Sequence, residues 1–242
     1  MLNSIITEKG AYLGLSLWVL CFWAGAFYRF PLHRTEQVFM SLCGGLGGVL
    51  VAGPLYRMGF WNPQPLWGWQ SKGVVYFDPA DFIFGFAFLG IVAISVQAIA
   101  GYQLLAEEKK STGPLEKLAV LCAVPTAGIL VALLGGNVMV VTIVGLLFGS
   151  MLMVAFRPDL VFVVLRGGVL SLLSYGILVG DFLLFLYLAN VHVDALGRAL
   201  SPYYVAYGPL KTAGTLALWA FVFGAFFASF YACMKNKYYD RA

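Results

Sequence analysis

The sequence predicts an all-α fold, a polytopic membrane bundle of about seven transmembrane helices. Hydrophobic residues make up 61% of the 242-residue chain and charged residues only 11%, and apolar runs of membrane-spanning length recur along it. Soluble domains are about half apolar and one-quarter charged, and a helix needs about 20 apolar residues to cross a bilayer. We therefore expect a single membrane domain over residues 1–242.

Seven apolar segments are predicted as spans, separated by glycine and proline breakers. In order, they cover residues 11–28, 37–55, 81–105, 118–134, 138–156, 168–188 and 210–233. Residues 159–166 are apolar enough either to extend the sixth helix or to lie along the interface. The first segment lacks a basic leader and a small-residue cleavage pattern, so it is expected to be a retained helix and not a signal peptide.

Lysine and arginine predict the orientation, because cytoplasmic loops are enriched in them. Of the 15 basic residues, ten lie on the side of the chain that follows the first, third, fifth and seventh spans, and five lie on the other side. The prediction is an N-terminus outside and a C-terminus in the cytoplasm. The net charge of +4 is spread over loop ends, which argues against a nucleic-acid partner.

The spans also predict an internal repeat. Residues 11–105 and 138–233 form two three-helix units, with the helix of residues 118–134 inserted between them. An offset of four spans preserves orientation, so the repeats would be parallel, related by an axis near the membrane normal. The aromatic, proline-bearing loops 56–77 and 189–208 would then share the outer face, as an interfacial belt or a ligand lid.

One short motif occurs with an acid in the first unit and without one in the second. The first copy opens a helix with Pro79-Ala80-Asp81-Phe82-Ile83-Phe84-Gly85-Phe86, and the second is Trp219-Ala220-Phe221-Val222-Phe223-Gly224. Together with Trp61-Asn62-Pro63, these residues resemble the integral-membrane lycopene cyclases of the heterodimeric type and their cyclase-like relatives. The family pattern is Pro-x-Glu, then a second acid, once per repeat.

The chain departs from that pattern at both copies. Asp81 takes the place of the leading glutamate and Phe82 that of the second acid. In the second copy, an alignment on Gly224 puts Thr215 at the glutamate position, and an alignment on Pro209 puts Lys211 there. Either way the carboxylate is lost, so whether the chain is an enzyme stays open.

The resemblance implies a carotenoid, another isoprenoid or a lipid bound between the repeats. Cyclising a carotenoid end group is redox-neutral and needs a general acid and a group that later removes a proton. Two carboxyl groups with different pKa values suit that task. The resemblance assigns the proton donor to Asp81 and ligand contacts to Trp61, Asn62, Phe84, Phe86, Trp219 and Phe221. Asp181, the acid inside a span, is the candidate second acid, and Lys211 is a further candidate ligand contact.

Other functions remain open from the residues alone. A non-catalytic subunit of a larger membrane complex, in contact with other membrane subunits, suits the small loops, and a small-solute transporter suits an acid inside a span. Asp181 is that acid, and it either marks a function or joins helices by a hydrogen bond. Lys211 either snorkels to the headgroups or neutralises Asp81 or Asp181. Two histidines and four scattered cysteines predict no metal site and no cofactor.

Overall fold

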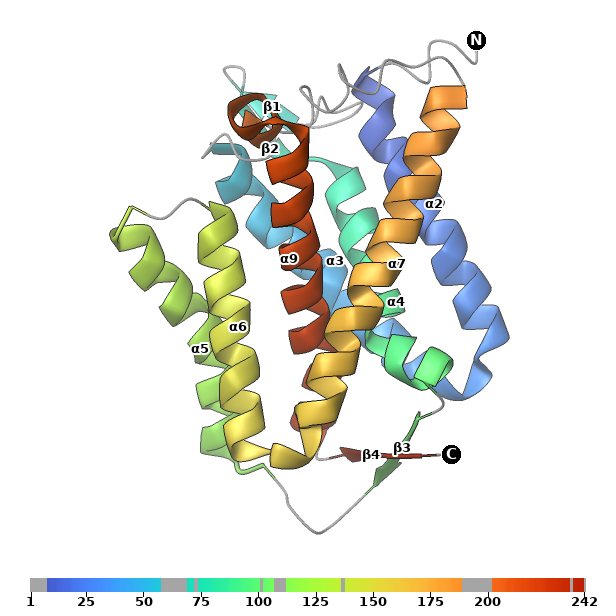
Figure 1. Ribbon diagram of the computed structural model, residues 1–242, viewed down its shortest axis with the longest axis vertical. Helices are drawn as coiled ribbons and strands as arrows, with labels where there is room; N and C mark the ends of the chain where they lie inside the picture. Colours follow the sequence, from blue (N-terminus) through green and yellow to red (C-terminus); the bar gives the residue numbers. More distant parts are fainter. Residues whose placement is uncertain are drawn as a thin grey trace. The chain divides into compact units, whose positions relative to one another are not determined.

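The computed structural model is predominantly helical (Figure 1). It describes residues 8–57, 69–71, 74–100, 102–106, 112–135, 138–188, 202–235 and 237–241. The helices of this part are α2 (Glu8–Arg29), α3 (Arg34–Arg57), α4 (Pro79–Ala100), α5 (Pro114–Leu133), α6 (Val138–Phe156), α7 (Val161–Leu188) and α9 (Pro202–Lys235). Two short 3-10 turns, η1 (Pro31–His33) and η2 (Pro158–Leu160), join α2 to α3 and α6 to α7.

Each predicted span falls on one of these helices, but three boundaries differ by five residues or more. Helix α9 begins at Pro202, eight residues before the seventh predicted span, so the predicted loop 189–208 is wrong at its end. Helix α7 begins at Val161, so most of the apolar stretch before the sixth predicted span extends that helix. The third span was predicted to reach residue 105, which is wrong, because α4 ends at Ala100 and the chain continues as the strand β3 (Tyr102–Ala106). Gly101 follows Ala100, and glycine just after a helix is typical of its end.

Two small antiparallel ribbons were not predicted from the sequence. The strand β1 (Trp69–Ser71) pairs with β2 (Val74–Phe77), and β2 lies beside α3. The strand β3 pairs with β4 (Lys237–Arg241), with Tyr102 opposite Arg241 and Ala106 opposite Lys237. This second pairing joins segments more than 130 residues apart in sequence, which a local pattern does not reveal.

The apolar helices support a multi-pass membrane protein. Five segments are long and apolar enough to cross a bilayer, namely α4, α5, α6, η2 with α7, and α9. Helices α2 and α3 pass the same criterion only as a pair, bent by 105° at the break before Pro31. The described residues therefore contain five candidate spans, or six if the bent pair is one span.

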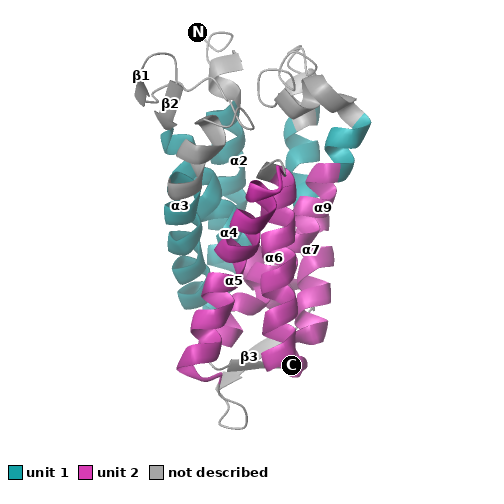
Figure 2. Ribbon diagram, turned by 90° about the vertical axis from the view of Figure 1, so that its left-hand side faces the viewer, with its two compact units in different colours: residues 1–91, 175–214 teal, residues 92–174, 215–242 magenta. Residues whose placement is uncertain are grey.

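The chain divides into two compact units, coloured in Figure 2. Unit 1 comprises residues 1–91 and 175–214, and unit 2 comprises residues 92–174 and 215–242. Helices α4, α7 and α9 contribute residues to both, so this spatial division differs from the predicted sequence repeats. The core of unit 2 is apolar, with Val120, Leu146, Met153, Val222 and Phe226 among its buried side chains.

The interior of unit 1 contains polar and acidic side chains. Its buried residues include Tyr12, Ser16, Gln37, Ser41, Asp78 and Asp81. Helices α3 and α4 approach each other closely there, because a Cβ on Gly44 would overlap the carbonyl oxygen of Gly85. In unit 2, α7 and α9 make a similar crossing, where a Cβ on Gly167 would lie 2.8 Å from the carbonyl oxygen of Gly224. Small residues let helix backbones approach in this way.

Candidate functional site

The start of α4 carries a buried acid that is bound by a side chain from another helix. Asp81, in the first turn of α4, is 5% exposed. Its Oδ1 accepts a hydrogen bond of 2.9 Å from the hydroxyl of Tyr12 on α2. An ionisable group inside a membrane segment is costly and marks a functional site by default. We therefore take Asp81 and Tyr12 as the centre of the candidate site.

Ser16 fixes α2 against α4 one turn along from Tyr12. Its Oγ lies 2.8 Å from the carbonyl oxygen of Tyr12 and 3.2 Å from the carbonyl oxygen of Ala80. A serine hydroxyl has one proton, so the two carbonyls share it. The carboxyl group of Asp81 and the backbone just before it are thus both tied to α2.

Asp78 is the residue immediately before α4 and caps the helix. Its Oδ1 accepts a hydrogen bond of 2.9 Å from the backbone N–H of Ala80, and its carbonyl oxygen accepts one of 2.9 Å from the N–H of Asp81. Aspartate is a preferred residue at this position because it satisfies free N–H groups of the first turn. Burial raises the pKa of the Asp78 carboxyl above its usual value, and the bond from Ala80 opposes that shift.

A row of aromatic rings runs from this site. The Phe84 ring centroid is 6.2 Å from that of Tyr12 and 5.5 Å from that of Phe88. Phe88 in turn lies 5.8 Å from Tyr175, in an edge-to-face arrangement. The predicted ligand residue Phe84 therefore adjoins the predicted acid, through a tyrosine that the sequence analysis did not single out.

The predicted ligand residue Phe86 has different neighbours. Its ring lies 5.0 Å from Trp23 and 5.9 Å from Phe82. Residues two apart on a helix do not share a face, so Phe84 and Phe86 contact different parts of unit 1.

The remaining predicted site residues lie as follows. The side chains of Asp181 on α7 and Lys211 on α9 are both exposed. On α9, the Trp219 ring is 4.9 Å from Phe223, and the Phe221 ring covers Gly168, where a Cβ would lie 2.8 Å from it. Trp61 and Asn62 lie outside the described residues.

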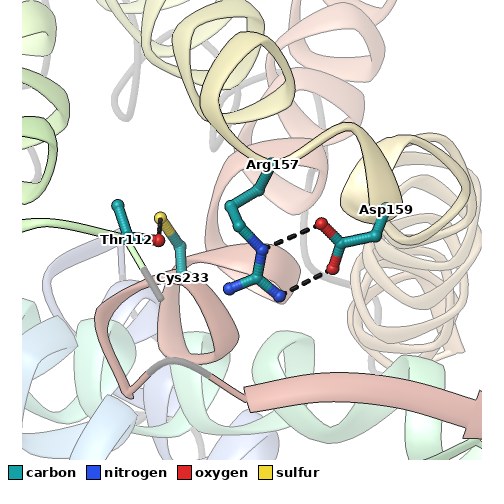
Figure 3. Close-up of polar contacts among 4 residues, drawn as sticks. All are labelled: Thr112, Arg157, Asp159 and Cys233. Atoms are coloured by element: carbon teal, nitrogen blue, oxygen red, sulfur yellow. Dashed lines mark hydrogen bonds and ion pairs between the residues drawn. The ribbon is translucent and has the colours of Figure 1, made fainter. Parts of the chain in front are cut away.

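A second polar cluster, at the turn η2 in unit 2, was also missed (Figure 3). Arg157 was expected only as an orientation signal and as part of the break before the sixth span, yet its side chain is buried, at 3% exposed. Its Nε and Nη2 donate to the two carboxylate oxygens of Asp159, at 2.8 and 2.6 Å. The hydroxyl of Thr112 lies 3.9 Å from the sulfur of Cys233 beside it. A two-residue spacing across a proline is the only sequence sign of this ion pair.

Within the described residues, no group of three or more histidine, cysteine, aspartate or glutamate side chains is arranged to hold a metal ion. Comparison with protein families, with curated proteins and with solved structures finds no match for this chain.

Proposed function

We propose that the chain is an integral membrane protein of two three-helix repeats, similar in plan to the integral-membrane lycopene cyclases. We further propose that it binds a carotenoid, another isoprenoid or a lipid beside Asp81. The observation that carries the binding proposal is the buried pair of Asp81 and Tyr12 at the end of a row of rings. Aromatic faces and edges pack well on an extended apolar chain, and the acid and hydroxyl offer it one polar contact.

The two proline turns support the repeat. The residue before each turn has nearly the same backbone conformation, with φ −120° and ψ 70° at Phe30 and φ −131° and ψ 76° at Arg157. Each also accepts a hydrogen bond from the third residue after it, at 3.1 Å from His33 and 2.9 Å from Leu160. The connections α2–η1–α3 and α6–η2–α7 are thus built alike.

The glycine crossings give independent support. Gly45, next to Gly44, faces the Phe82 ring, just as Gly168, next to Gly167, faces the Phe221 ring. Gly85 meets the carbonyl oxygen of Gly44, and Gly224 meets that of Gly167. This correspondence equates Phe82-Ile83-Phe84-Gly85 with Phe221-Val222-Phe223-Gly224.

The same correspondence bears on catalysis. The residue before each motif is Asp81 in the first copy and the buried Ala220 in the second. The correspondence favours Ala220, in place of Thr215 or Lys211, as the position that lacks the family's carboxylate. Because one copy has no acid, we propose ligand binding as the function. A redox-neutral cyclisation would depend on Asp81 as proton donor with Asp181 as the second acid.

We propose seven spans, with the N-terminus outside and the C-terminus in the cytoplasm. The turn η2 separates two segments that each qualify as a span, and the similar turn η1 favours counting α2 and α3 separately. The 22 residues of α2 are about 33 Å long at 1.5 Å per residue, enough for a hydrocarbon core of about 30 Å. A C-terminal fusion to green fluorescent protein should fluoresce, and one to alkaline phosphatase should be inactive. The reverse pattern would contradict this count or orientation.

The binding proposal is tested by purification from bacteria that accumulate lycopene. The full chain, extracted in mild detergent, should carry a polyene or other isoprenoid that is visible by absorption and by mass spectrometry of a solvent extract. Phe84→Ala should reduce the bound amount, whereas Phe148→Ala, at an exposed phenylalanine of α6 in unit 2, should not. A chain free of isoprenoid and lipid would refute binding. Co-purifying subunits in place of a ligand would favour the accessory-subunit function.

The same cells test catalysis, because ring-closed products would show a cyclase. Conversion that is undiminished in Asp81→Asn would exclude Asp81 from the reaction.

A further inference from the structure

A separate polar group lies inside unit 1, on helices α2 and α3. Gln37 and Ser41 on α3 are both 0% exposed. The amide Nε2 of Gln37 donates to the carbonyl oxygen of Trp23 at 3.0 Å, and the indole Nε1 of Trp23 donates to Ser41 Oγ at 2.8 Å. Because the amide nitrogen must face the carbonyl of Trp23, the Gln37 oxygen Oε1 is directed elsewhere.

This arrangement leaves one acceptor and one donor to be satisfied. The Oε1 of Gln37 has no hydrogen-bond partner among the described residues. Ser41 Oγ accepts the indole proton, so its own proton is available to donate. The two residues are one helical turn apart, with Cβ atoms about 5–6 Å from each other. A group placed between them would have to accept from Ser41 and donate to Gln37.

We propose that Gln37 and Ser41 bind a single O–H group in the interior of unit 1. A hydroxyl both accepts and donates, as the two partners require. A carboxylate offers Gln37 no proton, an ammonium offers Ser41 no acceptor, and a hydrocarbon offers neither. An unsatisfied acceptor is costly inside a bilayer, and buried waters typically satisfy such groups with two to four polar partners. The source is either water or the hydroxyl of a lipid or isoprenoid alcohol.

Gly90 on α4 supports the proposed site because it packs directly against Ser41 and Trp23. A Cβ at this position would overlap Ser41 Oγ and lie 2.5 Å from Trp23 Nε1. The absent side chain therefore lets α4 cover the Trp23–Ser41 hydrogen bond without displacing it.

Unit 2 has no comparable pair at the corresponding positions, if the proposed repeats hold. The turns align Gln37 and Ser41 with Val164 and Gly168, and the glycine crossings align them with Leu160 and Val164. Both alignments give residues without polar side chains. Ser229, which corresponds to Gly90, donates its hydroxyl to carbonyl oxygens of its own helix. The site belongs to the first repeat and does not depend on isoprenoid binding at Asp81.

The direct test is an experimental structure of the full chain in lipid that resolves ordered solvent. A density peak within hydrogen-bond distance of both Gln37 Oε1 and Ser41 Oγ is expected. An isolated peak identifies water. Density that continues into a chain, with an alcohol in the solvent extract, identifies a lipid or isoprenoid hydroxyl. Absence of a peak, with the Ser41 hydroxyl bonded to a helix carbonyl, would overturn the proposal.

A double-mutant cycle gives a second readout. Gln37→Met and Ser41→Ala should each lower the melting temperature, and the double variant should lower it by less than the sum, because either change already removes the bound group. Repeating the cycle with Trp23→Phe removes coupling through the indole. Ser150→Ala is the control, since that buried hydroxyl donates to Leu146 in its own helix. Additive losses in both backgrounds would count against the site.

Discussion

The substitution Gly48→Ala tests the crossing of α3 and α4 beside the candidate site. A Cβ on Gly48 would lie 2.6 Å from the carbonyl oxygen of Asp81, which is backbone and cannot rotate away. Real Cβ atoms almost never come within 3.0 Å of another heavy atom, and ordinary contact begins at 3.4 Å. The helices would therefore have to separate by about 0.4 to 0.8 Å, the difference between 2.6 Å and those limits.

The neighbouring Gly47 provides a matched control. A Cβ there would have no heavy atom within 4 Å. Glycine to alanine in a helix is worth up to about 1 kcal/mol through propensity, and overpacking costs about 1–3 kcal/mol. Both variants share the propensity gain, so Gly48→Ala should be about 1–3 kcal/mol less stable than Gly47→Ala.

The assay is the free energy of unfolding of both variants and of the wild-type chain in the same detergent and in lipid. The displaced carbonyl belongs to Asp81, so Gly48→Ala should also reduce the amount of ligand that co-purifies. Equal stability of Gly48→Ala and Gly47→Ala would refute the close crossing of α3 and α4.

Three further substitutions test the polar contacts. Tyr12→Phe removes the donor to Asp81 and should cost about 1–3 kcal/mol of unfolding free energy. Asp81→Asn should lower that cost in a double-mutant cycle, and equal costs in both backgrounds would exclude the contact. The pKa of Asp78 is raised in the folded protein, so as pH falls the folded state takes up a proton at a higher pH than the unfolded state does. This carboxyl therefore adds stability as pH falls from above the folded-state pKa to the unfolded-state pKa. Asp78→Asn should flatten that part of the pH dependence without lowering stability at neutral pH, because the amide oxygen still accepts from Ala80; an unchanged pH dependence would contradict it. Asp159→Asn removes the charge opposite the buried Arg157 and should cost about 1–2 kcal/mol, less than the 3–5 kcal/mol of a fully buried pair, because the Asp159 side chain is 41% exposed. Arg157→Met together with Asp159→Asn should recover part of this loss, and no recovery would show that the pair is not coupled.

The positions of several helices could be predicted because residues that end helices bound their apolar runs. Gly135-Gly136-Asn137 and the dipeptide Arg157-Pro158 bracket α6, which begins and ends as predicted. The end of α4 could not be predicted in this way. Tyr102-Gln103-Leu104-Leu105-Ala106 is apolar enough to continue a helix, and its strand state depends on β4, near the other end of the chain.

The candidate site shows a similar division. Asp81 could be singled out because an acid beside a long apolar run is rare. Tyr12 could not, because a tyrosine near a helix end is ordinary in a membrane protein, and its partner is 69 residues away. The alignments that put Thr215 or Lys211 at the acid position each depend on a single residue, Gly224 or Pro209. In the proposed repeat, the glycine contacts pair Gly85 with Gly224, which moves the comparison to Ala220.

The sequence alone determined that this is an apolar, multi-pass helical chain, that each long apolar run contains a helix, and that Asp81 opens one of them. Those properties follow from composition and local patterns, since a bilayer imposes helix length and hydrophobicity one segment at a time. Only the tertiary structure decided that Tyr12 binds Asp81, that Arg157 is buried, and that glycines mark the α3–α4 and α7–α9 crossings. These are contacts between distant segments, and their energies depend on how the helices pack and not on any local pattern.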